Sequence, residues 1–165
     1  MKALILISSI TLLCFLLNSC RPKLSVEATQ KGEPSIAFAY DSTLAAKLSA
    51  DEYGMKQYVI AFLRKGPYRD QDSMKTAQIM RKHLDNITRM ADEGRLAIAG
   101  PFLDDGEIRG IYIFNVSTIE EAKALTETDP AIKEGRLVME LHQWYGSAAL
   151  MTVNDVHKKI AKNKI

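Results

Sequence analysis

Residues 95–116 read RLAIAGPFLDDGEIRGIYIFNV, and this stretch decides the fold. It holds two apolar runs, 96–102 and 108–116, and the second is rich in the β-branched and aromatic residues that favour strands. Between the runs, Asp105-Gly106 is a pair that supplies the positive φ angles of a tight primed turn. The stretch therefore predicts a β-hairpin. A hairpin alone is only marginally stable in water, so we expect further strands and a covering layer.

The sequence before the hairpin predicts a strand and then a long helix. Residues 56–64, KQYVIAFLR, form an apolar run typical of a central strand that is buried on both faces. Asp72 or Ser73 can cap a helix that continues to about Glu93. Gly94 follows directly, as is common at the C-terminus of a helix.

The sequence after the hairpin predicts a second helix and a last strand. Ser117 or Thr118 can cap the helix, which carries acidic residues in its first turn and ends near Thr126. Residues 137–145, LVMELHQWY, form the last strand. With right-handed crossovers, the order β-α-β-β-α-β predicts an α+β, ferredoxin-like protomer, in which a four-stranded antiparallel sheet has both helices on one face.

The second face of the predicted sheet would lack a covering layer. We expect Tyr112, Phe114 and Trp144 to lie there. A large apolar patch of this kind is rare on a monomer. The sequence therefore predicts a homodimer in which two sheets pack face to face.

Composition limits the possible functions. The chain has 165 residues, 47% of them hydrophobic and 25% charged, which suits one domain with extensions. A net charge of +2 is too small to indicate a nucleic-acid partner. The three histidines are not closely paired and no C-x-x-C motif occurs, so the sequence predicts neither a metal nor an organic cofactor. No nucleotide-binding glycine motif or serine-hydrolase motif is present.

Residues 1–19 form an apolar segment that is shorter than a membrane-spanning helix and is typical of a secretory signal peptide. Its end, LNSC at 17–20, resembles a bacterial lipobox. This resemblance implies cleavage before Cys20 and a lipid on its thiol. A plain signal peptide with a chance cysteine, or an uncleaved anchor, remains an alternative. Arg21 follows instead of aspartate, which by resemblance favours the outer membrane, facing the periplasm.

Two further segments flank the domain predicted over 56–146. Residues 20–35, which begin with the lipidated cysteine, are polar and form a flexible tether. Residues 36–55 form an N-terminal extension with a short helix capped near Asp41. Residues 147–165 hold a C-terminal amphipathic helix, whose lysines form either a solvated face or a weak attraction to anionic lipid. Its apolar side comprises Met151, Val153, Val156 and Ile160.

His83 is the first candidate catalytic residue. At about 100° per residue it falls within the apolar stripe of the long helix, so its imidazole points toward the sheet. A buried histidine must find hydrogen-bond partners or lose its charge. It is therefore either a satisfied core histidine or a general acid or base. The stripe comprises Ile79, Met80, Leu84, Ile87, Met90 and Ala91.

Asp129 is the second candidate. Because Pro130 follows it, Asp129 can simply be the N-cap of a short turn. Alternatively, its carboxylate orients the imidazole and stabilises its charged form. Arg109 could hold an anionic substrate or merely leave the hairpin turn. On the last strand, His142 shares a face with Glu140 and Trp144, which could line a pocket or face a dimer partner.

The order of these motifs resembles the YciI-like (YCII-related) domain family, and residues 41–58 resemble a lipoprotein-associated subgroup of it. The resemblance implies a dimeric α/β barrel with a cleft in which His83 and Asp129 form an acid/base pair. It also implies lyase, isomerase or hydrolase chemistry on small aromatic or ring-derived substrates. The motifs that carry it are YVIAFLRKGP (58–67), RKHLDNI (81–87), EGRLAIAGPF (93–102), DPAIKEGRL (129–137) and ELHQWYG (140–146).

Three functions follow from these observations. The first is a periplasmic enzyme in which His83 moves a proton and Asp129 holds its tautomer. The second is a non-catalytic protein that binds a small ligand between Phe102, Tyr112 and Trp144. The third is a partner-binding envelope lipoprotein. The predicted substrate-binding residues are Gly100, Pro101, Phe102, Arg109 and Trp144.

Overall fold

The computed structural model describes residues 39–163. The predicted signal peptide, the lipid-carrying Cys20 and the predicted tether at 20–35 lie outside the described residues. So do the first residues of the predicted N-terminal extension and the last two residues of the chain. Among residues 39–163, no helix combines the length and the apolar character needed to cross a membrane.

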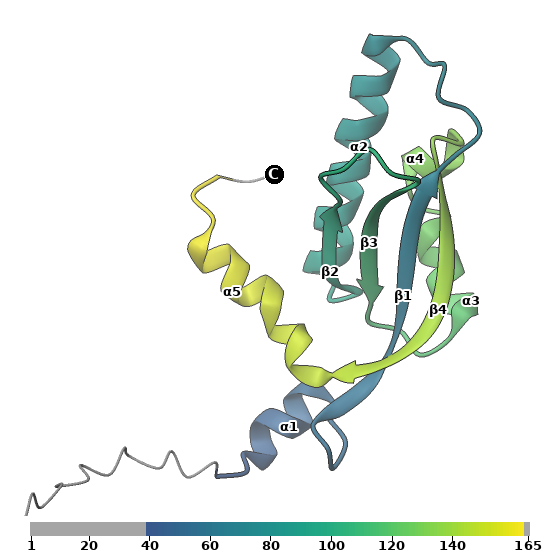
Figure 1. Ribbon diagram of the computed structural model, residues 1–165. Helices are drawn as coiled ribbons and strands as arrows, with labels where there is room; N and C mark the ends of the chain where they lie inside the picture. Colours follow the sequence, from purple (N-terminus) through teal and green to yellow (C-terminus); the bar gives the residue numbers. More distant parts are fainter. Residues whose placement is uncertain (1–38, 164–165) are drawn as a thin grey trace, which may run out of the picture. The chain divides into compact units, whose positions relative to one another are not determined.

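One four-stranded antiparallel sheet organises the domain, in the order β2-β3-β1-β4 (Figure 1). The predicted central strand is confirmed, because β1 pairs with both β3 and β4. This mixed architecture is compatible with the predicted ferredoxin-like fold. The strands are β1 (Met55–Lys65), β2 (Leu96–Pro101), β3 (Ile108–Phe114) and β4 (Leu137–Ser147).

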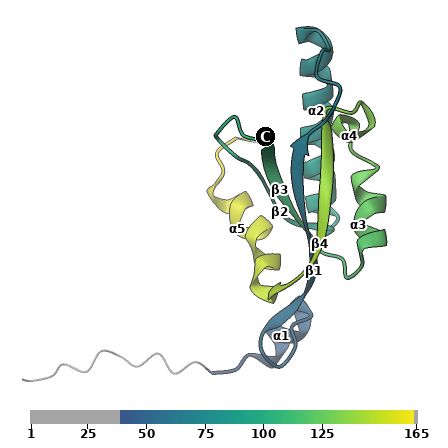
Figure 2. The same ribbon diagram turned by 45° about the vertical axis from the view of Figure 1, so that its right-hand side comes forward.

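Three helices cover one face of the sheet: α2 (Ser73–Asp92), α3 (Ile119–Thr126) and α4 (Pro130–Lys133) (Figure 2). The predicted caps of α2 are confirmed. The Asp72 carboxylate accepts the Lys75 N–H at 2.8 Å, and Gly94 adopts a φ of 68°, which glycine reaches without steric cost. Thr118 begins α3 with a reciprocal capping box, whose hydrogen bonds lower the pKa of the Glu121 carboxyl.

The predicted hairpin is confirmed, but the tight primed turn is wrong. Residues 102–107 connect β2 to β3, and among the described residues the glycines with positive φ are Gly54, Gly94 and Gly135. Side chains hold this longer loop instead. The Asp104 carboxylate accepts the Gly106 N–H at 3.3 Å, and the Arg109 guanidinium donates to the Asp104 carbonyl at 2.9 Å. A loop closed in this way does not require the positive φ angles of a two-residue turn.

The predicted positions of Tyr112 and Phe114 are also wrong. Both side chains belong to the core beneath the helices, in register with Ala61 and Val59 of β1. The reason is that both alternating sets of residues in β3 are apolar, so alternation does not show which set faces the helices. Trp144 does lie on the second face, where its ring packs against Tyr58 with centroids 5.8 Å apart.

The C-terminal segment packs on this second face of the sheet. Leu150 and Met151, from the 3-10 helix η1 (Ala148–Thr152), contact a small apolar cluster. Helix α5 (Val153–Ile160) follows, and it lies within the predicted segment 147–165. The predicted N-terminal helix is α1 (Ser42–Leu48), capped by Asp41, and it contacts η1 without burying a side chain. The cluster comprises Tyr58, Ala97 and Ile113.

Candidate active site

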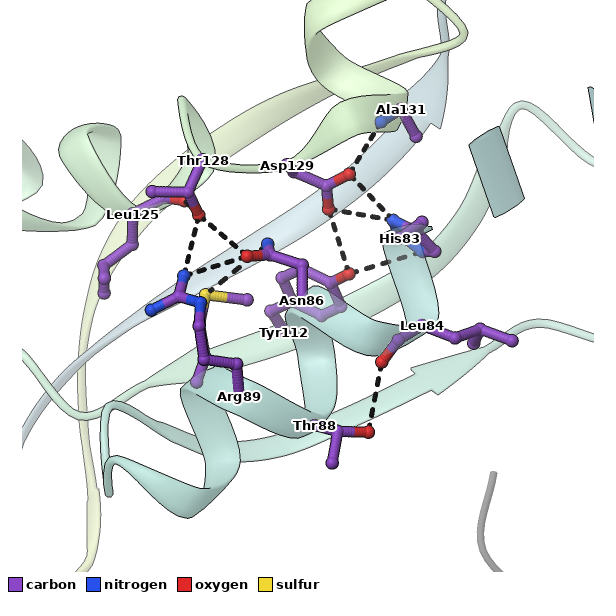
Figure 3. Close-up of polar contacts among 11 residues, drawn as sticks. His83, Leu84, Asn86, Thr88, Arg89, Tyr112, Leu125, Thr128, Asp129 and Ala131 are labelled. Carbon is purple, nitrogen blue, oxygen red and sulfur yellow. Dashed lines mark hydrogen bonds and ion pairs between the residues drawn. The ribbon is translucent and has the colours of Figure 1, made fainter. Parts of the chain in front are cut away.

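His83 and Asp129 meet between the helices and the sheet (Figure 3). The Nδ1 atom of His83 lies 2.9 Å from Oδ1 and 2.8 Å from Oδ2 of Asp129. Helix α2 points His83 at the sheet and leaves 6% of it exposed, whereas Asp129 is fully buried. The structure thus brings together the two residues that the sequence singled out, although 46 positions separate them.

Asp129 serves two purposes at once. Its Oδ1 atom accepts the Ala131 N–H at 2.8 Å, which caps α4, and Pro130 takes the first helical position. The same carboxylate faces the His83 imidazole. The two interpretations of Asp129 were therefore not exclusive: the cap fixes the position of the carboxylate, and the carboxylate fixes the ring of His83.

Tyr112 completes the cluster from β3. Its hydroxyl lies 3.4 Å from Nε2 of His83 and donates to Oδ2 of Asp129 at 3.4 Å. Its ring stacks on the imidazole with centroids 6.2 Å apart. Burial, reinforced by the negative charge of Asp129, raises the pKa of the Tyr112 hydroxyl far above its usual value, so the group stays protonated. From its sequence, Tyr112 was expected on the other face of the sheet, and its contacts with His83 and Asp129 were not predicted.

The contacts define which protons the cluster can hold. Because the Asp129 carboxylate only accepts, it selects the tautomer of His83 that carries a proton on Nδ1. Nε2 then offers its lone pair to the Tyr112 hydroxyl. If Nε2 gains a proton, the hydroxyl can accept from Nε2 and donate to Asp129. The cluster can therefore satisfy His83 in both of its protonation states, as a general acid/base requires.

A second set of polar contacts anchors the chain next to Asp129. The Oδ1 atom of the buried Asn86 accepts from Thr128 Oγ1 at 3.1 Å and from Arg89 Nη2 at 2.8 Å (Figure 3). Arg89 also pairs with Glu93. Because Thr128 directly precedes Asp129, these bonds tie the start of α4 to the helix that carries His83.

Access to the pair is restricted. His83, Tyr112 and Asp129 are all buried, and every buried side-chain polar atom of the described residues has a hydrogen-bond partner. Two cavities of about 510 and 260 Å³ lie near the N-terminal end of β1, and Gln57 and Tyr145 line both of them. Neither of these two cavities touches the cluster, and the 6% exposure of His83 leaves little of the residue open to a substrate.

The structure does not bring the predicted substrate-binding residues to the pair. Gly100, Pro101 and Phe102 lie at the end of β2, and the Arg109 guanidinium is bonded to its own hairpin loop. Trp144 lies on the opposite face of the sheet from His83. Their role in binding a substrate stays a prediction.

The predicted grouping on the last strand is confirmed. Glu140, His142 and Trp144 share the second face of the sheet, where they pair with Phe62, Ile60 and Tyr58 of β1 in turn. His142 Nε2 lies 2.9 Å from Glu140 Oε1 at the surface. Within residues 39–163, no group of three or more histidine, cysteine, aspartate or glutamate side chains is arranged to hold a metal ion. That this chain uses no metal and no cofactor stays a prediction.

Comparisons with known proteins give structural neighbours and a family. A solved structure of 5-chloro-2-hydroxyhydroquinone dehydrochlorinase (TftG) from Burkholderia phenoliruptrix AC1100, in complex with 2,5-dihydroxybenzoquinone, is 18% identical in sequence. The similarity has a TM-score of 0.41 and covers 54% of this chain and 93% of that chain. The comparison with curated proteins finds no match. The model of the YCII-related domain matches residues 60–144, and the chain therefore belongs to the YCII-related domain family.

Proposed function

We propose that this protein is an enzyme that acts on a small aromatic or ring-derived substrate by acid–base chemistry. His83 moves a proton, Asp129 orients it, and the reaction is of the lyase, isomerase or hydrolase type, without metal or organic cofactor. The observation that carries the proposal is the buried contact of His83 Nδ1 with both carboxylate oxygens of Asp129, closed by the Tyr112 hydroxyl on Nε2.

Physical reasoning favours a functional role over a purely structural one. A buried ionisable pair is weak support for stability, because well-packed apolar residues of the same volume often stabilise a core as well or better. Ionisable groups clustered away from water are instead common where proton transfer is required. Apart from the nearby Asn86, the core around the pair is mainly apolar and includes Ile79, Met90 and Leu96.

The geometry favours Nε2 of His83 as the reacting atom. Nδ1 is held by Asp129, and the Tyr112 oxygen lies 3.4 Å from Nε2, which is long for a hydrogen bond. A substrate group can therefore compete with Tyr112 for Nε2. Asp129 supports the imidazolium that forms when Nε2 takes the proton, and the Tyr112 hydroxyl keeps its own proton throughout.

The second candidate is a non-catalytic lipoprotein that binds a small ligand or a partner in the envelope. The observation that favours it is the burial of the cluster, since neither described cavity reaches His83. In that case the pair would be structural. Ligand binding would then raise the thermal stability without any turnover.

We further propose that the protein is a homodimer, anchored through a lipid on Cys20 at the periplasmic side of the outer membrane. The lipobox-like LNSC supports the anchor, and the incompletely covered sheet face supports the dimer. Metabolic labelling with a fatty-acid analogue should label the wild-type protein and leave Cys20→Ser unlabelled, because serine has no thiol to carry the lipid. If the wild-type protein takes up no label and keeps residues 1–19, the segment is an uncleaved anchor instead.

The enzyme proposal is tested by a turnover screen with small phenolic and quinone-like compounds. For any compound that the wild-type protein converts, His83→Gln should lower the rate by about 10²- to 10⁴-fold. His142→Gln is the matched control, because His142 also contacts a carboxylate but lies at the surface. Circular dichroism confirms that both variants fold. Full activity of His83→Gln would contradict the assignment.

A further inference from the structure

Helix α5 is amphipathic, but its apolar side is the exposed one. Val153, Val156 and Ile160 fall within one stripe at about 100° per residue. They are 38%, 51% and 73% exposed, respectively. An amphipathic helix on a globular domain normally buries its apolar stripe in the core of that domain.

The polar side of α5 holds it against its own domain. The Asn154 amide donates to the Leu96 carbonyl at 2.8 Å, and Lys158 Nζ lies 2.9 Å from the Asp92 carboxylate. Asp92 raises the pKa of the Lys158 ammonium group, which keeps the pair charged. Polar contacts therefore orient the helix so that its apolar stripe remains available to pack against another surface.

This stripe lies on the same side of the sheet as the open face of the strands. Figure 2 shows α5 on one side of the sheet and α2, α3 and α4 on the other. On that face Leu150 and Met151 cover only one small cluster. The apolar residues on the rest of the face are Val138 and Trp144, which are exposed, and Ile60, Phe62 and Ile111, which are half-buried. The same face also carries the polar residues Arg64, Glu140 and His142, and Glu140 pairs with the other two.

We infer that α5 is an arm whose stripe of Val153, Val156 and Ile160 packs against the open sheet face of a second copy of this chain. The inference rests on the proposed homodimer and adds a segment that lies beyond the residues matched by the family, 60–144. A two-fold interface is reciprocal, so each copy gives one arm and receives one on its own strands.

The area of the sheet face favours an added arm. The four strands are 11, 6, 7 and 11 residues long. At a mean of about nine residues they span roughly 19 by 30 Å, or about 570 Å² in plan. A stable interface buries about 800 Å² on each partner. Part of the face is already covered by η1. Pairing of the sheet faces alone therefore falls short, and the apolar stripe of α5 is the adjacent surface that can extend the contact.

The charge of α5 disfavours a lipid surface as the occupant. Electrostatic recognition of anionic lipid takes clusters of about four to eight basic residues. The segment at 147–165 carries four lysines, at 158, 159, 162 and 164. Lys158 is engaged by Asp92, and Asp155 offsets one of the other three charges. A second copy needs no such charge, because the stripe of α5 can contact the apolar side chains of the sheet face, such as Val138 and Trp144.

Site-specific photo-cross-linking tests the arm in the full chain purified in detergent. Benzoylphenylalanine placed at Val156 should give a covalent dimer, with the cross-linked peptide drawn from residues 55–65 or 137–147 of the other copy. The same group at Lys159, which lies on the polar side of α5, is the matched control and should give little dimer. Cross-links from Val156 to detergent or to its own chain only would overturn the inference.

Paired substitutions measure the size of the effect. Val156→Ser with Ile160→Ser should raise the dimer dissociation constant about 10- to 100-fold in sedimentation experiments. Lys159→Ser with Lys162→Ser should leave it unchanged. Because Val156 and Ile160 are exposed, neither pair should shift the urea midpoint of the monomer. If instead the lysine pair weakens binding to vesicles of phosphatidylcholine and phosphatidylglycerol, and the apolar pair leaves dimerisation intact, the occupant is lipid and the inference is wrong.

The outcomes separate this inference from the proposed homodimer. If the variant without the apolar residues of α5 dimerises normally, the proposed homodimer stands and the inferred role of α5 is wrong. If the wild-type protein is a monomer, both the homodimer and the role of α5 are wrong. Neither result bears on turnover at His83, which is tested separately.

Discussion

The chain contains two histidine–carboxylate pairs with nearly the same contact distance and very different surroundings. His83 lies 2.8 Å from Asp129, and His142 lies 2.9 Å from Glu140. The side chains of the first pair are 7% and 0% exposed, whereas those of the second are 50% and 45% exposed. Distance alone therefore does not identify which pair has a function.

The elements that hold each pair explain the difference. Three elements converge on the first pair, because α2 carries His83, the start of α4 carries Asp129, and β3 carries Tyr112. The second pair sits on one strand, two residues apart, and Arg64 shares the carboxylate. Bonds from His142, and then from Arg64, lower the pKa of Glu140. Solvent screens such a surface pair, which contributes little to stability.

The largest expected effect is that of Asp129→Ala. This change leaves His83 buried without its partner and removes the cap of α4. Breaking a buried pair costs about 3–5 kcal/mol, so the free energy of unfolding in urea should fall by that amount. Glu140→Ala is the matched control and should leave the urea midpoint unchanged. Equal effects at the two sites would break the distinction between the pairs.

Tyr112→Phe should lower the free energy of unfolding by about 0.5–1.5 kcal/mol at neutral pH, because it removes one hydroxyl and its hydrogen bonds. The pH dependence is more specific. The folded state holds the pKa of Tyr112 above the value of about 10 that an unfolded chain shows, so this contribution is complete below pH 10 and is lost as the pH rises further.

Urea unfolding at pH 9, 10 and 11 measures this difference. Above pH 10, the stability of the wild-type protein should fall more steeply than that of Tyr112→Phe, by up to about 1.4 kcal/mol per pH unit. Tyr53→Phe is the control, because the Tyr53 ring is exposed. Parallel pH profiles for wild type and Tyr112→Phe would show that the hydroxyl is not held as described.

The smallest expected effect on stability is that of Gly146→Ala, a change on the sheet face that carries Trp144. The Trp144 ring lies over Gly146, where an added Cβ would come within 2.4 Å of the indole. Gly146→Ala should therefore push the indole away from Tyr58 and shift the tryptophan fluorescence to longer wavelength, with little change in the urea midpoint. Trp144 is the single tryptophan, so the signal is unambiguous. An unchanged spectrum would contradict the packing described here.

Local sequence signals predicted most of the fold. The caps at Asp72 and Thr118 and the stop at Gly94 each depend on neighbours within a few residues, and all three are confirmed. The tight turn at Asp105-Gly106 failed because side chains of a longer loop replaced the backbone geometry that the pair can supply. Turn type depends on the length of the loop, which the sequence did not fix.

The candidate site was predictable only in part. The position of His83 on the apolar stripe of α2 followed from helical periodicity. For Asp129 the residues left two alternatives open, a helix cap or a partner of His83, and the family resemblance favoured the partner. Tyr112 was missed because IYIF is apolar on both faces, so its side could not be assigned. A usable signal existed, since a buried tyrosine hydroxyl needs a hydrogen-bond partner and His83 was already expected beneath the helix.

The central claim is that Asp129 holds His83 in one tautomer with Nε2 directed at Tyr112. Nitrogen-15 NMR of the three imidazoles tests it most directly, with His142 and His157 as internal references. We predict that His83 carries its proton on Nδ1 in the wild-type protein, that Asp129→Asn abolishes this preference, and that Glu140→Gln leaves it intact. A His83 ring protonated on Nε2, and unaffected by Asp129→Asn, would contradict the account.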